Sequence, residues 1–172
     1  MVELERQNKK INTKIYNKVL KDLRKVIEKN IPIDHVGSTT IPNMYGKNII
    51  DVLIGAENET ELEELTIKLK DLGYFPGRNS NGMIYRFFAS TEEETKSGDV
   101  HIHLVIIDSD RYRDFLTLKK YLLKNKEERK NYSNLKKDLI KKGHFVREDY
   151  ISIKSRYVSE LLERAKKEFE KE

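Results

Sequence analysis

The spacing of apolar residues changes along the first half of the chain and predicts helices and strands in turn. A helix is predicted over residues 12–29, where one face carries a stripe at helical spacing: Ile15, Val19, Leu23, Val26 and Ile27. It ends before Pro32, because the residue before a proline avoids the helical region. A second amphipathic helix follows Thr60, which forms a capping-box signature with Glu63, and Gly73 is expected to stop it.

Short runs rich in β-branched and aromatic residues predict strands between and after these helices. The strands are expected at residues 33–36, 49–54, 83–89 and 100–107, and further along the chain the pattern is helical. No linker or repeat divides the sequence, so a single domain is predicted over residues 1–172. The predicted fold class is α+β: a sheet of four to five strands with flanking helices and a helical C-terminal third.

Alternation within two of these strands separates apolar from polar side chains. Along strand 100–107, one face is apolar and the other carries His101 and His103. Strand 49–54 divides in the same way, and Asp51 lies on the face opposite Ile50, Val52 and Ile54. If the apolar faces pack on helices, Asp51 and the two histidines share the remaining face.

Composition removes several classes of protein. The 172 residues include no cysteine, which excludes disulfides, thiolate metal sites and cysteine nucleophiles and suits a reducing cytoplasm. The N-terminus lacks the apolar core of a signal peptide, and no apolar run approaches the roughly 20 residues of a membrane helix, so we expect a cytoplasmic protein without a membrane partner. The net charge of +5 comes from lysines scattered among acids, which favours solvated helix faces over a nucleic-acid surface.

The segment between the first two strands carries the chemistry. Gly37 and Ser38 form a turn whose backbone amides and hydroxyl are suited to hold a phosphate. Asp51 interrupts an apolar strand, and such a charge is costly unless it meets a cation, a metal or good donors. It is therefore a metal ligand or general base, or one half of a structural ion pair with a lysine or arginine. A phosphate cradle followed by a strand-borne carboxylate is the outline of a site for a metal-bound nucleotide.

The sequence of this segment, HVGSTTIPNMYGKNIIDVLI, resembles the signature of the GrpB family, a group of small bacterial proteins assigned to the nucleotidyltransferase superfamily. The resemblance continues in Arg86-Phe87-Phe88, in His101-Ile102-His103-Leu104 and in the tail from Tyr150 to Lys154. It implies a nucleotidyltransferase-like mixed sheet. The resemblance supplies the superfamily rather than the reaction, and one expectation for the reaction is transfer of a nucleotidyl group from a nucleoside triphosphate to an unidentified hydroxyl acceptor.

The chain departs from the pattern of active nucleotidyltransferases, in which carboxylates at alternate positions of one strand hold two Mg²⁺ ions and a neighbouring strand adds a third carboxylate. Counting 12 and 14 residues from Gly37 to those two positions reaches Ile49 and Asp51, so the first carboxylate is replaced. The neighbouring strand offers His101 and His103, and imidazoles prefer Zn²⁺ or Mn²⁺ to Mg²⁺. We expect a divalent metal at Asp51, His101 and His103, with Mg²⁺ or Mn²⁺ first and Zn²⁺ as the alternative. Asp51 and His103 are the candidates for catalysis.

Basic side chains near these motifs are candidates for neutralising phosphates. Lys47, Arg86 and Lys154 are predicted to bind phosphate together with Gly37 and Ser38. The expected ligand is a nucleoside triphosphate or another phosphorylated small molecule.

Two functions remain open. The first is metal-dependent nucleotidyl transfer. The second is a catalytically inactive module that keeps the nucleotide pocket, binds a nucleotide or small molecule, and partners another enzyme. Ile49 favours the second, whereas the retained Asp51 and the His-x-His pattern favour chemistry at the site.

Overall fold

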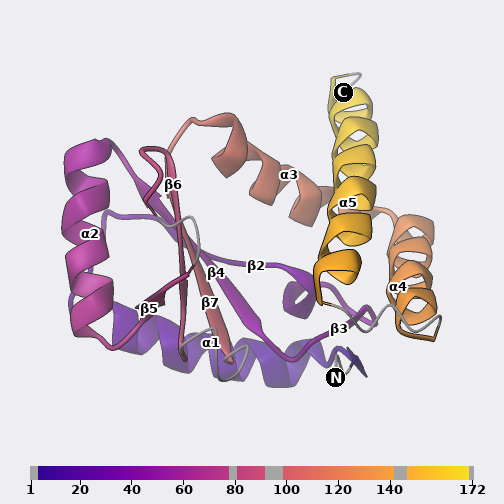
Figure 1. Ribbon diagram of the computed structural model, residues 1–172, viewed down its shortest axis with the longest axis horizontal. Helices are drawn as coiled ribbons and strands as arrows, with labels where there is room; N and C mark the ends of the chain where they lie inside the picture. Colours follow the sequence, from indigo (N-terminus) through magenta and orange to yellow (C-terminus); the bar gives the residue numbers. More distant parts are fainter. Residues whose placement is uncertain (1–3, 78–80, 92–98, 142–146, 171–172) are drawn as a thin grey trace.

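A mixed five-stranded sheet forms the centre of the computed structural model, which describes residues 4–77, 81–91, 99–141 and 147–170 (Figure 1). In spatial order the strands are β2 (Ile33–Val36), β4 (Ile50–Ala56), β7 (Val100–Ile106), β6 (Tyr85–Ala89) and β5 (Phe75–Pro76). The central strands β4 and β7 run parallel, and every other neighbouring pair in this sheet is antiparallel. The predicted α+β class with four to five strands is confirmed.

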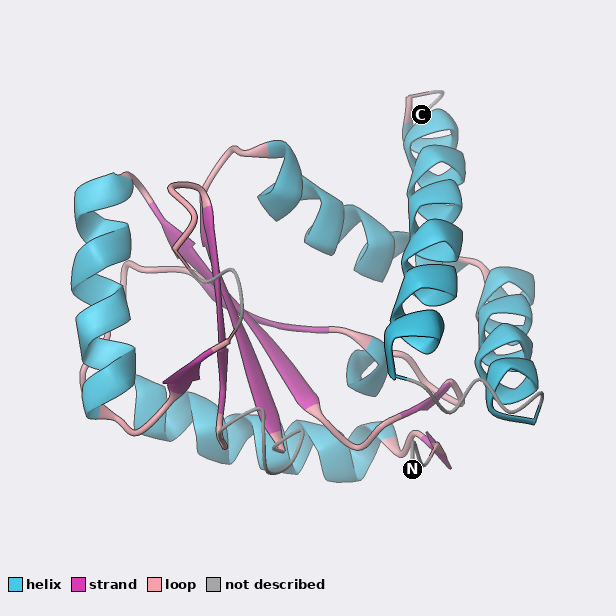
Figure 2. Cartoon of the chain, viewed as in Figure 1, coloured by secondary structure: helices cyan, strands magenta, loops and turns pink. Residues whose placement is uncertain are grey.

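Helices lie on both sides of the sheet (Figure 2). The first two, α1 (Lys9–Leu23) and α2 (Glu59–Asp71), cover one face, and α3 (Asp110–Lys124) contacts the other. The last two, α4 (Lys126–Lys141) and α5 (Arg147–Phe169), pack against α3. They complete the helical C-terminal third that the sequence predicts.

The main core fills the space between the sheet and the two N-terminal helices. It takes the apolar faces of β4 and β7, and its most deeply buried members include Val52, Ile54, Leu62, Ile102 and Leu104. The register of these strands pairs Asp51 with His101 and Leu53 with His103, so the predicted alternation is confirmed. The face opposite the main core is therefore the one that carries Asp51 and the histidines.

The limits of α1 differ from the predicted 12–29 at both ends. It begins after Asn8, whose side chain accepts hydrogen bonds from the amides of Lys10 and Ile11. It ends at Leu23, because the chain then forms tighter turns in which the amide of Lys25 donates to the carbonyl of residue 22 at 3.2 Å. The spacing of apolar residues continues through that turn, so the sequence predicted a C-terminal end for this helix that lies too far along the chain.

The limits of α2 are closer to the prediction. The cap is Asn58 rather than Thr60, since the Asn58 side chain accepts from the amide of Glu61 at 3.0 Å. Glu61 in turn accepts from the amide of Glu57, which satisfies a second free donor at this end. Gly73 has a φ of 87° and ends the helix as predicted.

A second, smaller sheet joins β1 (Glu5–Arg6) to β3 (Tyr45–Gly46). Strands of two residues leave no periodic pattern, so the sequence does not predict them. Behind this sheet, the buried side chain of Gln7 donates to the carbonyl of Gly46 at 2.9 Å and accepts from Asn12 at 2.8 Å. The start of α1 is thereby tied to the connection between β2 and β4.

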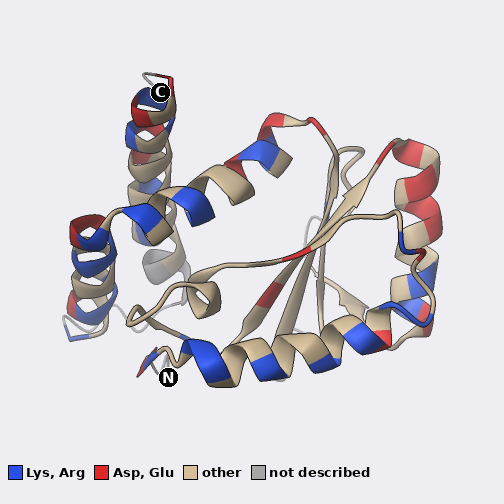
Figure 3. Ribbon diagram, turned by 180° about the vertical axis from the view of Figure 1, so that it is seen from behind, with Lys and Arg blue, Asp and Glu red and all other residues tan. Residues whose placement is uncertain are grey.

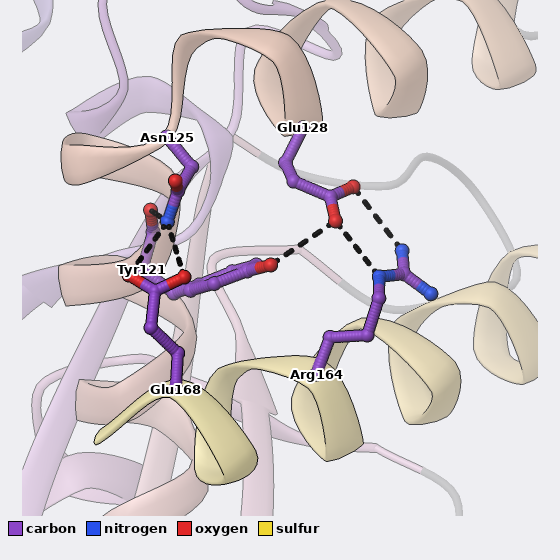
Figure 4. Close-up of polar contacts among 5 residues, drawn as sticks. All are labelled: Tyr121, Asn125, Glu128, Arg164 and Glu168. Atoms are coloured by element: carbon purple, nitrogen blue, oxygen red, sulfur yellow. Dashed lines mark hydrogen bonds and ion pairs between the residues drawn. The ribbon is translucent and has the colours of Figure 1, made fainter. Parts of the chain in front are cut away.

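A second core and a polar network join α3, α4 and α5 (Figure 4). The buried members of that core are Ile41, Met44, Tyr121, Leu122, Tyr132, Leu161 and Ala165. In the network, Glu128 accepts from the hydroxyl of Tyr121 at 3.1 Å and from two nitrogens of Arg164 at 2.8 and 3.1 Å. The hydrogen bond from Arg164 lowers the pKa of Glu128. Because Glu128 lies on α4 and Arg164 on α5, the two helices are held as a pair.

Charged residues are carried mostly by the helices. Lys and Arg are interspersed with Asp and Glu along α3, α4 and α5, whereas the sheet holds few of either (Figure 3). Within the described ranges, no helix combines the length and the apolarity that crossing a membrane requires.

His35 lies on the main-core side of β2. Its ring stacks on Tyr16 with 4.4 Å between centroids, and its Nε2 lies 2.9 Å from the hydroxyl oxygen of Thr39. Burial, followed by the positive charge of Lys119, lowers the pKa of His35 to about 4, against the opposing charge of Asp51. His35 is therefore neutral in the folded protein at pH 7.

We predict that His35 makes the fold less stable as the pH falls from about 6.5, its pKa in an unfolded chain, toward 4. In this range the unfolded chain binds a proton at His35 and the folded protein does not, so the stabilisation is complete above the unfolded pKa and declines below it. Urea titrations at about pH 7 and about pH 4.5 measure the decline. His35→Gln does not titrate, and its loss of stability over this range should be smaller. Equal losses in the two proteins would contradict the assignment to His35.

Candidate functional site

Asp51 lies between two imidazoles on the face of the sheet opposite the main core. Its Oδ1 is 3.5 Å from Nδ1 of His101 and 3.5 Å from Nε2 of His103. The parallel register of β4 and β7 produces this arrangement, because it places Asp51 directly beside His101. The three side chains are 23%, 21% and 15% exposed, so solvent reaches all of them. The structure thus brings together the predicted Asp51, His101 and His103.

The surroundings of Asp51 favour its charged form. Burial acts to raise the pKa of Asp51, but hydrogen bonds from His101 and His103 outweigh it and hold the pKa below its usual range. No lysine or arginine within the described part of the chain forms an ion pair with this carboxylate. Asp51 is therefore an anion at neutral pH whose contacts are two titratable ligand-type side chains.

The distances from Oδ1 of Asp51 to the two histidine nitrogens can be compared with those between the ligand atoms of a metal site. Two donor atoms that bind one Zn²⁺ at 2.0–2.1 Å with tetrahedral geometry lie roughly 3.4 Å apart, and both measured separations are 3.5 Å. No three His, Cys, Asp or Glu side chains in the described ranges are already arranged as a complete metal site. The donor set fits a divalent metal only if the imidazoles turn their lone pairs toward a common point and the ligand or water supplies the remaining positions.

Tyr85 fixes the orientation of His103 from the far side. Its hydroxyl lies 3.0 Å from Nδ1 of His103, while the ring of Phe115 packs on the same imidazole with 4.6 Å between centroids. The guanidinium of Arg111 lies 3.9 Å above the ring of Tyr85. A partner at Nδ1 leaves Nε2 directed at Asp51, which is how outer residues commonly orient a histidine ligand. Sequence reasoning missed Tyr85, although its place two residues from Phe87 on an alternating strand puts it on the histidine face.

The turn at Gly37 lies directly against Asp51. Gly37 has φ 75° and ψ −173°, a conformation that is essentially restricted to glycine. A Cβ atom built there would overlap the Asp51 carboxylate. Ser38 begins the short helix η1 (Ser38–Thr40), and its side chain packs against Gly46 of β3. The predicted Gly37 and Ser38 therefore lie at the site, with the glycine backbone nearest to the carboxylate.

Two polar contacts, one buried and one partly buried, hold η1 in place. The side chain of Asn12 donates to the carbonyl of Thr39 at 3.4 Å, and the hydroxyl of Thr40 donates to the carbonyl of Gly37 at 2.8 Å. The contact of His35 with the Thr39 hydroxyl adds a third. The turn beside Asp51 is thus fixed by residues of α1, β2 and η1 itself.

Arg86 lies outside this site, contrary to the prediction. It pairs with Leu104 in the sheet and so projects from the main-core face, whereas its neighbours Tyr85 and Phe87 project toward the histidines. Its guanidinium pairs with Glu63 on α2 and donates to the hydroxyl of Thr66 at 2.9 Å. Proximity in sequence suggested a shared site, but the alternation of strand side chains places Arg86 on the opposite face.

The other predicted lysines occupy different positions. Lys47 is half-buried in the connection between β3 and β4, and its carbonyl accepts from Gln7 at 3.4 Å. Lys154 is half-buried on α5, where its charge interacts with that of Lys136 on α4. Ile49, at the position of the missing carboxylate, is 7% exposed and offers no ligand atom.

Lys136 is a buried charged residue that the sequence reasoning did not single out. It is 3% exposed, and burial, followed by the charge of Lys154, lowers its pKa to about 7, while Asp51 opposes this effect. The signal in the sequence is its spacing: Lys136 falls on the apolar stripe of α4, between Tyr132 and Leu139, where a lysine is unexpected.

Two clefts lie away from Asp51 and the two histidines. One of about 310 Å³ surrounds Arg86 and Glu63, and one of about 500 Å³ lies beside Arg6 and the first turn of α1. Neither is lined by Asp51, His101 or His103.

The chain is similar to GrpB proteins both in sequence and in fold. The model of the GrpB protein family matches residues 2–164. The glutamate-rich protein GrpB of Alkalihalophilus pseudofirmus is 30% identical over 135 residues, which are 76% of this chain and 76% of that protein. A crystal structure of the conserved protein GrpB from Enterococcus faecalis has the same fold, with a TM-score of 0.83 and 21% identity over 97% of this chain and 99% of that one. A crystal structure of the Cid1 poly(U) polymerase shows a weaker likeness, with a TM-score of 0.45 and 8% identity over 69% of this chain and 38% of that one.

We predict that Gly37→Ala destabilises the protein more than Gly73→Ala. Both glycines have a positive φ, which costs a residue with a Cβ roughly 1–3 kcal/mol. Only at Gly37 does the new Cβ also overlap Asp51, whereas nothing lies within 4 Å of a Cβ at Gly73. Urea unfolding of the two variants measures the difference. Equal losses of unfolding free energy would show that the turn does not press on the carboxylate.

Proposed function

The chain belongs to the GrpB family, and we propose that its site at Asp51 binds a nucleoside triphosphate or a related phosphorylated small molecule together with a divalent metal. The observation that carries the proposal is an ionised carboxylate on an apolar strand that contacts two partly exposed histidines. An ion pair that served stability alone would place a lysine or arginine on Asp51, and within the described residues none is there. The setting we propose is one domain of 172 residues in the cytoplasm.

In this proposal, one group of residues would bind the metal and another would bind the phosphates of the ligand. Asp51, His101 and His103 would hold the metal, and Tyr85 would keep His103 oriented toward it. The backbone of the Gly37–Ser38 turn and the side chains of Lys47 and Lys154 would contact the phosphates. A bound divalent metal supplies positive charge that clamps phosphate oxygens and lowers the pKa of an attacking hydroxyl.

Nucleotidyl transfer is the activity that this arrangement supports, with Asp51 and His103 as the catalytic candidates. In that reaction an acceptor hydroxyl attacks the α-phosphorus of the triphosphate, its proton passes to a base, and pyrophosphate leaves. If Asp51 and His101 alone hold the metal, His103 would be free to take the proton, because its Nε2 faces the same space as the Asp51 carboxylate. Release of pyrophosphate in the presence of Mn²⁺ and an acceptor would distinguish this activity from binding alone.

A binding module without catalysis is the alternative, and Ile49 is the observation that favours it. The buried isoleucine leaves the site with one strand carboxylate where two-metal chemistry uses a pair. Such a module would sense a nucleotide or small molecule and act through a protein partner. In that case the ligand binds unchanged and no pyrophosphate appears.

We predict that Asp51→Asn and His103→Gln abolish metal-dependent nucleotide binding while leaving the fold intact. For the wild type, a nucleoside triphosphate with Mn²⁺ at 100 times its Kd should stabilise the protein by about 2.7 kcal/mol, which a thermal-shift assay detects. Both variants should melt within a few degrees of the wild type without ligand, because each side chain is partly exposed and, within the described residues, neither pairs with a lysine or arginine.

Asp34→Asn is the matched control, since it removes a carboxylate from the neighbouring strand β2. It should keep the nucleotide-induced shift. Wild-type binding in the Asp51 and His103 variants, or a large loss of their stability without ligand, would refute the site. Absence of any shift with common nucleotides and with either Mg²⁺ or Mn²⁺ would argue against both functions.

A further inference from the structure

The outer faces of α1 and α2 carry opposite charges. α1 has five lysines and one acid, whereas α2 has five acids and two lysines. Both helices bury their apolar residues against the same face of the sheet, so their charged faces point away from the sheet on one side of the molecule (Figure 3). The candidate ligand site at Asp51 lies on the other face of the sheet.

The lysines of α1 form a stripe along its outer face. Lys10, Lys14 and Lys18, the lysine stripe, follow one another at intervals of four residues, and all three are exposed. Within the described residues none of them forms an ion pair, and like charges at this spacing repel each other. Beside the stripe, Ile11 and Ile15 are 56% and 43% exposed. The free helix thus presents uncompensated positive charge next to two isoleucines that contact water.

The outer face of α2 is acidic and also includes an exposed isoleucine. Glu64, Ile67 and Asp71, the acidic stripe, recur three and four residues apart, opposite the buried Leu65 and Leu69. Ile67 is 59% exposed, and in the described part of the chain neither acid of the stripe forms an ion pair. The two stripes are therefore complementary in charge, and each has apolar side chains that a partner could cover.

The stripes do not neutralise each other within one molecule. The described ion pair that joins these parts of the chain is between Lys68 of α2 and Glu28, which follows α1, at 2.6 Å. Its polarity is the reverse of that between the stripes. Because both stripes face away from the sheet, a second molecule can contact the two of them together.

We propose that the lysine stripe of α1 docks on the acidic stripe of α2 in a second copy of this chain. A two-fold axis between the helices places α1 of each copy on α2 of the other, so both contacts form together and the assembly closes at two copies. The contacts pair opposite charges and remove the exposed isoleucines from water. The two sites at Asp51 stay on the outer sides of the dimer.

A second copy fits this surface better than another anionic partner does. Along α3, α4 and α5 basic and acidic residues are interspersed, so among the described helices α2 is the one whose charge complements α1 (Figure 3). A nucleic acid or an anionic membrane would attract the lysine stripe but repel the acidic stripe on the same side of the molecule. A second copy satisfies both stripes.

Sedimentation of the full chain at two salt concentrations tests the dimer. Between about 0.1 M and about 1 M salt the Debye length falls from roughly 10 to 3 Å, which screens charge pairs across an interface. We expect a dimer at the lower salt and a dissociation constant that is at least roughly tenfold higher at the higher salt. A wild type that stays monomeric at the lower salt, or a dimer that salt does not weaken, would overturn the proposal.

Charge reversal locates the interface. Lys14→Glu and Glu64→Lys each place like charges opposite each other in both contacts, so each variant alone should be monomeric at the lower salt. An equal mixture of the two should recover the dimer, because each variant then meets the opposite charge in its partner. Both positions are exposed, and circular dichroism checks that the variants are folded. Lys130→Glu, the same charge change on the exposed face of α4, is the matched control and should dimerise as the wild type does.

The remaining outcomes decide between this dimer and its alternatives. Single variants that dimerise as the wild type does, or a mixture that stays monomeric, would refute the pairing of the stripes. Monomeric wild type and Glu64→Lys that sediment with anionic phospholipid vesicles, when Lys14→Glu does not, would assign the lysine stripe to a membrane and overturn the dimer. Asp51→Asn should dimerise normally whether or not it binds nucleotide, so the dimer and the proposed function can fail separately.

Discussion

The ionised carboxylate of Asp51 is the constraint on which the arrangement of the candidate site depends. A charge on a strand of Ile, Val and Leu loses hydration and must be stabilised by nearby groups. Two histidines on β7 supply those groups, and they reach it because β4 and β7 are parallel and in register. The turn after β2 can come close because Gly37 has no side chain and adopts a positive φ. The sheet register and the turn therefore both place groups next to the carboxylate oxygens of Asp51.

The helical C-terminal third has its own support and is also tied to the turn beside Asp51. α4 and α5 are joined by the hydrogen bonds of Glu128 with Arg164 and by a separate apolar core. α4 in turn docks on β3 through Ser133, and Gly46 of β3 packs against Ser38 of that turn. The packing of the C-terminal helices therefore helps to hold the turn in place.

The sequence allowed prediction of the half of the site that follows strand periodicity. Alternation along two strands placed Asp51, His101 and His103 on one face, and that prediction is confirmed. The same rule, applied to β6, would have placed Arg86 on the opposite face and Tyr85 on the histidine face. Lys136 falls on the apolar stripe of α4 between Tyr132 and Leu139, but α4 is rich in lysine, and the structure is needed to show that this one is buried. Contacts between distant segments leave no local pattern in the sequence.

The charge of Asp51 restricts what the proposed site can hold. The carboxylate repels a simple anion, whereas a metal–phosphate complex would present positive charge to it. The proposed binding therefore requires only residues that are present. Catalysis has a further requirement, since the buried Ile49 stands where a second carboxylate would share the metal charge. Transfer of a nucleotidyl group would need His101, His103 or the ligand itself to replace that carboxylate, whereas binding needs no replacement.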